Sequence, residues 1–172
     1  MPASSYEREL KGILEADIGV LKRIIKKCNA ETSRKYLLIE KNPFMVIRAA
    51  GSLGFDLLAV RCNLSIPIEV KSSISGTVPF TSNSSRELKQ AELFQSRCTR
   101  VGLFPLYALR LKGAKNDAWR VFTLEMGEVN DGLNEIYESL PRIDKTRGGN
   151  YVLRWENGKP LSDFIEMLCS QK

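Results

Sequence analysis

The sequence predicts a single α/β domain in which helices pack against a mixed sheet. Segments with the apolar spacing of helices alternate along the chain with short runs rich in β-branched and aromatic residues. The length of 172 residues fits one domain, and no internal repeat or linker divides the chain. Residues 1–172 are therefore expected to share one core.

The chain begins with a predicted helix over residues 4–29, because apolar residues recur there at three- and four-residue steps. They are Tyr6, Leu10, Ile13, Leu14, Leu21, Ile24, Ile25 and Cys28. Gly12 and Gly19 permit a break around residues 15–17. Residues 31–41 are charged and are compatible with a short helix that ends before Pro43.

Three strands are predicted next, each a β-rich run bounded by small or polar residues: 44–48, 55–60 and 66–71. The Ser/Thr-rich stretch 72–85, which contains Gly76 and Pro79, is predicted to be a loop.

The second half of the chain continues the alternation of helices and strands. A helix is expected first, because Leu88, Ala91, Phe94 and Cys98 have the spacing of one helix face. It is expected to end near Gly102. The elements expected after it are a hairpin of strands 105–112 and 118–124, a helical excursion over 127–147, a strand at 151–155 and a terminal helix over 161–169.

The overall composition is that of an ordinary soluble domain. Hydrophobic residues make up 43% of the chain and charged residues 27%. No apolar stretch approaches the roughly 18 residues that a membrane span needs, and the N-terminus lacks the pattern of a signal sequence. We therefore expect a cytoplasmic protein without a membrane partner.

The residue types present exclude several kinds of catalysis. The chain has no histidine, which removes Ser-His-Asp triads and Cys-His nucleophiles. Its four cysteines, Cys28, Cys62, Cys98 and Cys169, form no CxxC motif, so we expect buried thiols and no zinc cluster. Catalysis must then use carboxylates, lysine and a metal ion, with no organic cofactor. The net charge of +6 favours a polyanionic partner.

Three charged residues lie inside strands that otherwise have a buried character. Asp56 belongs to the second predicted strand, whereas Glu69 and Lys71 lie on one face of the third because side chains alternate along a strand. The short connection 61–65 allows the two strands to pair antiparallel, which brings Asp56 near Glu69. Two carboxylates and an ammonium suit Mg²⁺-assisted hydrolysis of a phosphodiester. The alternative is a plain salt bridge between Asp56 and Lys71 on an exposed face, with Glu69 solvated.

Several segments also match a known family in their order along the chain. They are 6–10 (YEREL), 46–52 (VIRAAGS), 56–59 (DLLA), 68–71 (IEVK), 105–108 (PLYA), 119–122 (WRVF), and Gly158 before 161–168. Together these segments resemble the archaeal Holliday junction resolvases of the PD-(D/E)xK nuclease superfamily. The motif E-x-K alone is common, whereas R-x-A-G-S followed by D and then by E-V-K is specific.

The resemblance implies a role for each matching polar residue. Asp56 and Glu69 correspond to metal ligands and Lys71 to the catalytic lysine. Glu7 corresponds to a further acid that projects from the first helix to the metal site. Ser52 lies in the glycine-containing loop that the family uses near the scissile phosphate, although a plain turn would also explain it.

Two basic residues, Arg8 and Arg48, match positions that contact DNA phosphates, although Arg48 could instead form a salt bridge between elements. The sequence departs from the compact family pattern in two insertions, at about 17–41 and 127–147. Because the first insertion follows the first helix, Glu9 or Glu15 could take the place of Glu7 as the acid of the site.

The resemblance also implies a restriction-endonuclease-like core, with a central mixed five-stranded sheet flanked by helices. Its implied activity is that of a crossover junction endodeoxyribonuclease. Such an enzyme uses Mg²⁺, with Mn²⁺ as a substitute, and cuts four-way (Holliday) DNA junctions by paired phosphodiester hydrolysis as a homodimer. The alternatives are a restriction or repair nuclease of the same superfamily acting on duplex or flap DNA, and a non-catalytic DNA-binding subunit. The complete set of Asp56, Glu69 and Lys71 speaks against the last.

Overall fold

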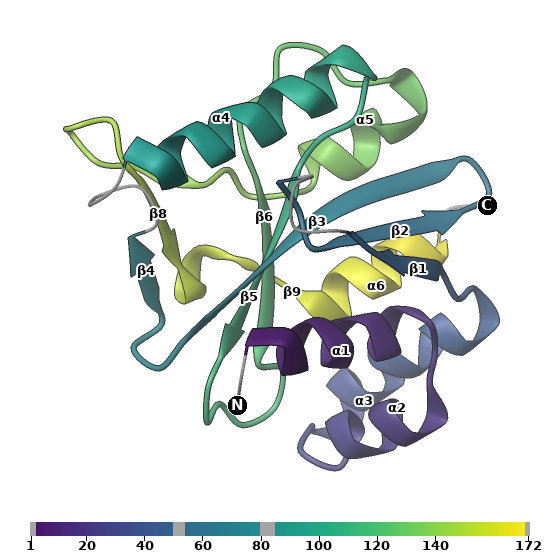
Figure 1. Ribbon diagram of the computed structural model, residues 1–172. Coiled ribbons are helices and arrows are strands. Elements are labelled where there is room, and N and C mark those ends of the chain that lie inside the picture. Colours follow the sequence, from purple (N-terminus) through teal and green to yellow (C-terminus); the bar gives the residue numbers. More distant parts are fainter. Residues whose placement is uncertain (1–2, 50–53, 80–84, 171–172) are drawn as a thin grey trace.

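The computed structural model of the chain describes residues 3–49, 54–79 and 85–170, and has the predicted α/β architecture (Figure 1). Its main sheet is mixed and has six strands in the order β1-β2-β3-β5-β6-β9. The strands are β1 (Met45–Arg48), β2 (Leu57–Arg61), β3 (Leu64–Ser73), β5 (Leu106–Leu111), β6 (Trp119–Thr123) and β9 (Lys159–Pro160). Only β3 and β5 pair in parallel among these neighbours. The expected five-stranded centre is thus present, extended by the two-residue β9.

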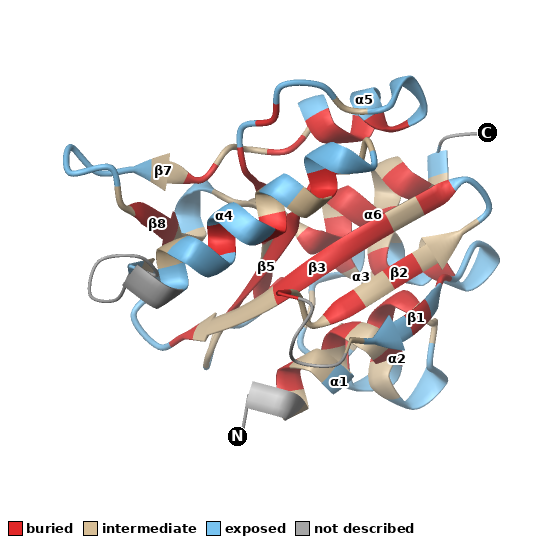
Figure 2. Ribbon diagram, turned by 45° about the horizontal axis from the view of Figure 1, so that its top comes forward, coloured by how far each residue is buried: buried red, intermediate tan, exposed pale blue. Residues whose placement is uncertain are grey.

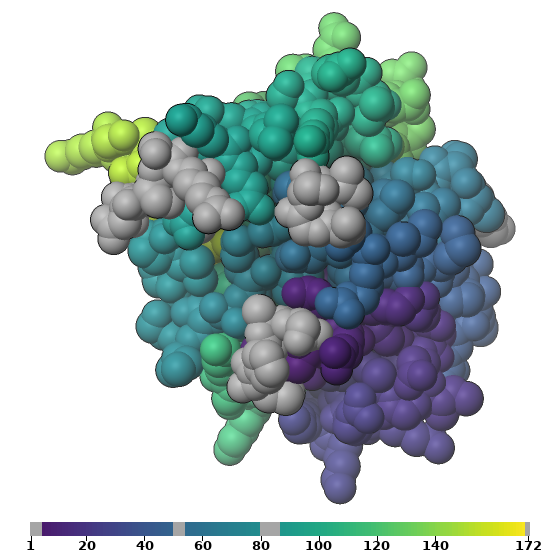
Figure 3. Space-filling model, viewed as in Figure 1, coloured from purple at the N-terminus to yellow at the C-terminus, as the bar shows by residue number. Residues whose placement is uncertain are grey.

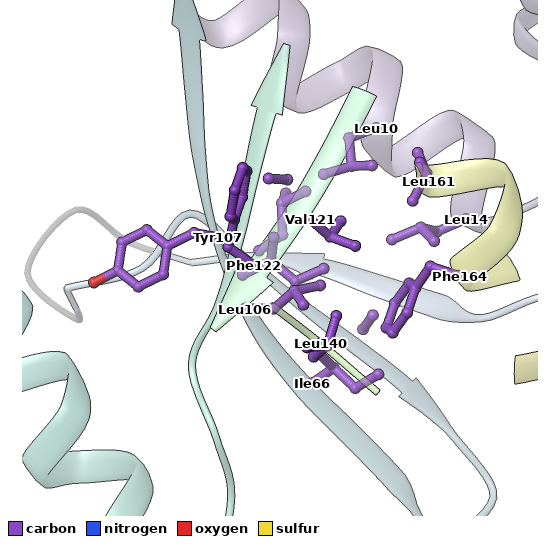
Figure 4. Close-up of a cluster of buried hydrophobic side chains, with 14 of the residues drawn as sticks. Leu10, Leu14, Ile66, Leu106, Tyr107, Val121, Phe122, Leu140, Leu161 and Phe164 are labelled. Atoms are coloured by element: carbon purple, nitrogen blue, oxygen red, sulfur yellow. The ribbon is translucent and has the colours of Figure 1, made fainter. Parts of the chain in front are cut away.

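Helices cover both faces of the main sheet, and most of β3 and β5 is buried between them (Figure 2). On one face, α1 (Ala3–Leu14) and α6 (Leu161–Ser170) bury apolar side chains against Ile66 and Ile68. Figure 4 shows Leu10, Leu14, Leu161 and Phe164 gathered on this side, whereas Tyr107 points away from them. The opposite face lies under α4 (Ser85–Arg100), where the ring centroid of Phe94 is 5.8 Å from that of Tyr107.

The first insertion forms a small helical unit beside α1. The expected break occurs at Ala16, whose φ is 57°, and Asp17 then caps α2 (Ile18–Ile25) by accepting the Val20 amide at 2.8 Å. A Cβ atom at Gly12 would lie 2.5 Å from a Val20 methyl carbon, so glycine permits the close approach of α1 and α2. The unit is completed by α3 (Ala30–Leu37) and the 3₁₀ helix Leu38–Lys41.

The outer edge of β1 is closed by side chains of α1 and of the turn that follows it. Lys11 donates to the carbonyl of Val46, and Glu15 accepts the Val46 amide at 3.1 Å. Lys11 and Glu15 also form an ion pair with each other. A pair of opposite charges therefore provides the hydrogen bonds that another strand would provide at this edge.

A second, three-stranded sheet has the order β4-β8-β7 and departs from the prediction. It consists of β4 (Thr77–Pro79), β8 (Tyr151–Arg154) and β7 (Asp144–Lys145). The predicted loop 72–85 is therefore wrong where it contains the end of β3 and the whole of β4, and residues 80–84 lie outside the described part. The second insertion contains one helix, α5 (Asp131–Glu138), followed by β7.

The sequence also predicts buried thiols and no membrane-spanning segment. All four cysteines are free; Cys98 is buried and Cys28 and Cys169 are half-buried, but Cys62 is exposed. The prediction of a buried thiol is wrong for Cys62 because this residue lies in the turn between β2 and β3, with a φ of 51°. No helix in the described ranges is both long enough and apolar enough to cross a membrane.

Candidate active site

The site begins where β2 stops pairing with β3. The last pair of that ladder joins Leu57 to Ile68, so the stretch of β3 from Glu69 onward pairs with β5 alone. The Val70 amide lies just beyond the ladder, and the Asp56 carboxylate accepts its hydrogen bond at 2.7 Å. Asp56 therefore replaces a strand partner for β3, and this fixes its carboxyl group at the margin of the sheet.

Glu69 and Lys71 lie together on the face of β3 that α4 covers, as the alternation of side chains predicts. Lys71 Nζ donates to Glu69 Oε1 at 2.8 Å, and the Glu69 residue is only 7% exposed. The alternative arrangement, with Glu69 solvated and Lys71 paired to Asp56, is therefore wrong. One ammonium group stands beside a buried carboxylate, in agreement with the predicted trio.

The two carboxyl groups of the site are close enough to affect each other. Burial raises the pKa of Asp56 above its ordinary value, the Val70 hydrogen bond lowers it, and the charge of Glu7 raises it again. Burial also raises the pKa of Glu69, the charge of Lys71 lowers it, and the charge of Asp56 raises it. The net upward direction in both groups means that the Lys71 ammonium does not offset the effect of burial on these carboxyl groups.

Of the three acids considered on the first helix, Glu7 is the one that approaches this site. Its charge acts on Asp56, and its Oε2 accepts a hydrogen bond from Arg48 at 2.7 Å. Glu9 points elsewhere, because it accepts hydrogen bonds from Arg110 at 2.7 Å and from the indole of Trp119 at 2.9 Å.

Glu15, the other alternative, contacts Lys11 and the amide of Val46 at the edge of β1. Its carboxylate therefore has a structural role on the outer side of that strand. With Glu9 and Glu15 engaged in this way, the geometry favours Glu7 as the first-helix acid.

The remaining predicted residues have mixed outcomes. Arg48 ends β1 with a side chain that is 45% exposed, and its ion pair with Glu7 places it beside the acids. Arg8 is exposed on α1. Ser52 lies outside the described residues. A contact of Arg8 or Arg48 with phosphate stays a prediction.

A shallow cavity opens between the site and the first turns of α4. Residues that the sequence did not assign to the site line it together with Glu69 and Lys71: Gly54, Glu87, Gln90, Ala91 and Tyr107. Tyr107 lies there because it is the register partner of Glu69 on β5. The helical spacing, which places Ala91 against the sheet, is the sequence signal for the contact of α4 with this face.

The donors of the site suit a hard divalent cation. The described residues contain no group of three or more His, Cys, Asp or Glu side chains ready to hold a metal ion. Mg²⁺, however, commonly binds through one or two carboxylates and completes its shell with water and substrate phosphates. Asp56 and Glu69 are such a pair, and burial raises the pKa of each, so both carboxylates lack solvation that a bound cation would replace. The residues present therefore fit Mg²⁺.

Comparison with known proteins gave matches among solved structures. No protein-family model matches the chain, and no curated protein matches it in sequence. A solved structure of Hjc from Archaeoglobus fulgidus, a Holliday junction resolvase from an archaeal hyperthermophile, is similar to this chain. The similarity has a TM-score of 0.48 at 21% identity and covers 77% of this chain and 91% of Hjc. At this similarity the function has to be inferred from the side chains of the site.

Proposed function

We propose that this protein is a Mg²⁺-dependent endodeoxyribonuclease that cuts four-way DNA junctions. The observation that carries the proposal is the convergence of Asp56, Glu69 and Lys71 at the free margin of β3, with Glu7 reaching the same place from α1. Carboxylates beside a lysine are groups suited to phosphodiester hydrolysis in a chain without histidine. The choice of four-way junctions over other DNA rests on the resemblance of the sequence segments.

Each side chain has a distinct task in this mechanism. Asp56 and Glu69 would hold the cation, which when bound polarises the scissile phosphate and lowers the pKa of a water molecule. Asp56 is oriented by the Val70 amide, which donates to its Oδ2 atom, and its carboxylate lies beside that of Glu69. Lys71 has a side chain that is 29% exposed beside Glu69, so its ammonium can also reach a phosphate oxygen and stabilise the charge that develops there.

The proposed active species is a homodimer. One chain carries one such site, whereas resolution of a junction requires cuts in two opposed strands. A two-fold axis relating two copies would present two equivalent sites to a substrate that has similar symmetry.

The experiment that tests the proposal incubates the purified protein with four-way, flap and linear duplex DNA, in Mg²⁺, in Mn²⁺ and in EDTA. We expect paired cuts in the junction with either metal and none in EDTA, and Asp56→Asn serves as the matched inactive control. Preferential cutting of the flap or the duplex would indicate a repair or restriction nuclease instead. Binding of DNA without any cutting would indicate a non-catalytic subunit.

The oligomeric state is measured separately by light scattering during size-exclusion chromatography, with and without junction DNA. We expect the mass of two chains, both alone and with one junction bound. A monomer on a cleaved junction would contradict the dimeric mechanism and leave the nuclease assignment standing.

A further inference from the structure

The outer face of α2 carries a cluster of positive charge that the active site does not use. It consists of Lys22 and Arg23 on α2 and of Lys26 and Lys27 in the turn that directly follows it, all of them exposed. We call this cluster the basic face of α2. The opposite side of the helix packs into the core through Leu21, which is 1% exposed, and Ile24.

These cations are not balanced by neighbouring acids. Residues 18–30 contain no Asp or Glu. The acids that flank this stretch are engaged, because Asp17 caps α2 and Glu31 pairs with Lys35 at 3.2 Å. Within the described part of the chain, no carboxylate lies at ion-pair distance from any of the cations of the basic face.

A loop from the main sheet adds to the same surface. The Asn116 amide donates to the carbonyl of Lys27 at 3.0 Å, and the Asn29 amide donates to the Asn116 side chain at 2.9 Å. The exposed Lys115 is therefore held next to the end of α2. The positive surface thus has a fixed position relative to the sheet.

α2 lies on the side of α1 away from the main sheet (Figure 1). In Figure 1, α2 runs alongside α1 and returns toward the N-terminal half of that helix, which carries Glu7. Packed helices have axes about 8–10 Å apart. In the space-filling view of Figure 3, α1 and α2 form one continuous lower part of the surface. A duplex that leaves the active site across α1 would therefore meet α2 within one turn of the DNA.

The surrounding chemistry indicates which polyanion fits. A basic amphipathic helix can bind an anionic membrane, but such a helix needs its apolar side free to enter the lipid. Here Leu21 and Ile24 are buried in the protein. A phosphate backbone needs only exposed cations, since its binding is driven by release of counterions.

We propose that the basic face of α2 binds the phosphate backbone of a DNA duplex arm whose other end occupies the active site. This inference rests on the proposed function and gives the first insertion a role in substrate binding. Contacts of this kind carry no sequence information, so they would hold and orient an arm of any sequence.

The test measures binding of a fluorescent four-way junction by anisotropy over a range of salt concentrations. All proteins carry Asp56→Asn, so that no cleavage occurs. In the α2 variant, Lys22, Arg23, Lys26 and Lys27 are all replaced by glutamine, which keeps helix propensity and removes charge. If each cation contacts one phosphate, the slope of log K against log salt should fall by about 3–4 units, with an affinity loss of at least about tenfold at low salt.

A matched control removes the same number of charges elsewhere. Its replacements, also by glutamine, are at the exposed residues Lys41, Arg100, Lys145 and Arg147. This variant should keep most of the slope and the affinity. Thermal unfolding of both variants shows whether they are folded, and hydroxyl-radical footprinting should show that only the α2 variant loses backbone protection within one helical turn of the incision site.

Each outcome separates the two ideas. An unchanged slope in the α2 variant, or equal losses in both variants, overturns the role of the basic face while cleavage by the unmodified protein still supports the proposed function. Binding that depends on α2 in a protein that never cuts DNA overturns the nuclease and keeps the binding surface. A protein that binds no DNA at all overturns both.

Discussion

Asp56 combines two tasks that a pair of substitutions can separate. Its Oδ2 atom accepts the Val70 amide at 2.7 Å, and its charge contributes to the metal site. Asp56→Asn keeps an oxygen acceptor for Val70 and removes the charge, whereas Asp56→Ala removes both. The folded structure also disfavours the charged form of Asp56, since burial raises its pKa. We therefore expect Asp56→Asn to be at least as stable as the unmodified protein.

The magnitude of the difference follows from the lost hydrogen bond. In Asp56→Ala the Val70 amide has no strand partner on that side of β3. A donor left without a partner costs about 1–3 kcal/mol, and the half-buried position of Val70 places the value in the lower part of that range. We expect Asp56→Ala to be about 1–2 kcal/mol less stable than Asp56→Asn. For a chain of this size this corresponds to about 2–8 °C in the unfolding temperature.

The assay is urea unfolding of the three proteins at pH 7 in EDTA, followed by cleavage of a junction in Mg²⁺. Both variants should be inactive, because each removes a metal-binding charge. Equal stabilities of the alanine and asparagine variants would refute the structural role of the Val70 hydrogen bond. Cleavage by Asp56→Asn at the unmodified rate would refute the assignment of Asp56 to the metal site.

Further predictions concern the other charged residues. Glu7→Gln should lower the single-turnover rate by at least about an order of magnitude, since it removes charge beside Asp56; Glu9→Gln should keep that rate, because Glu9 contacts Arg110 and not the site. Glu69→Gln should gain stability over the unmodified protein as the pH rises from about 4.5, measured by unfolding in EDTA. Between that ordinary value and the raised pKa of Glu69, the folded protein binds more protons than the unfolded chain, so the free energy of unfolding falls as the pH rises. The Glu69→Gln variant lacks this loss. A difference in the free energy of unfolding between the two proteins that stays constant from pH 4 to 8 would contradict the prediction. Arg48→Ala should flatten the salt slope of junction binding by about one unit when the guanidinium moves from Glu7 to a phosphate, and an unchanged slope would leave Arg48 with a structural role alone.

Much of the site could be predicted because its geometry is local. Glu69 and Lys71 share a face through the two-residue period of one strand. Asp56 meets them because a short turn joins β2 to β3. The choice of Glu7 over Glu9 also follows from helix geometry, since residues two apart point in different directions. The structure confirms that Glu9 is engaged elsewhere.

The parts that the sequence did not predict depend on contacts between distant segments. β4 is a short, polar segment that looks like loop, and it is a strand because Val78 pairs with Leu153. Strand formation depends on such neighbours more than on intrinsic preference. Asp117 is a similar case, because the sequence places it in a hairpin turn. In the structure it is 6% exposed and accepts hydrogen bonds from Tyr36 on α3 and from the Ser162 amide of α6.

Asp117 differs from the two carboxylates of the candidate site, Asp56 and Glu69, in its hydrogen bonds. Both oxygens of Asp117 are used, since Oδ1 accepts the Tyr36 hydroxyl at 2.7 Å and Oδ2 accepts the Ser162 amide at 2.9 Å. At the margin of β3, in the described part of the chain, backbone and ammonium donors reach one oxygen of Asp56 and one of Glu69. The two carboxylates thus lie side by side, and burial raises the pKa of both, which means that folding disfavours their charged forms. Raised pKa values of this kind are expected where a cation and a substrate phosphate complete the set of ligands.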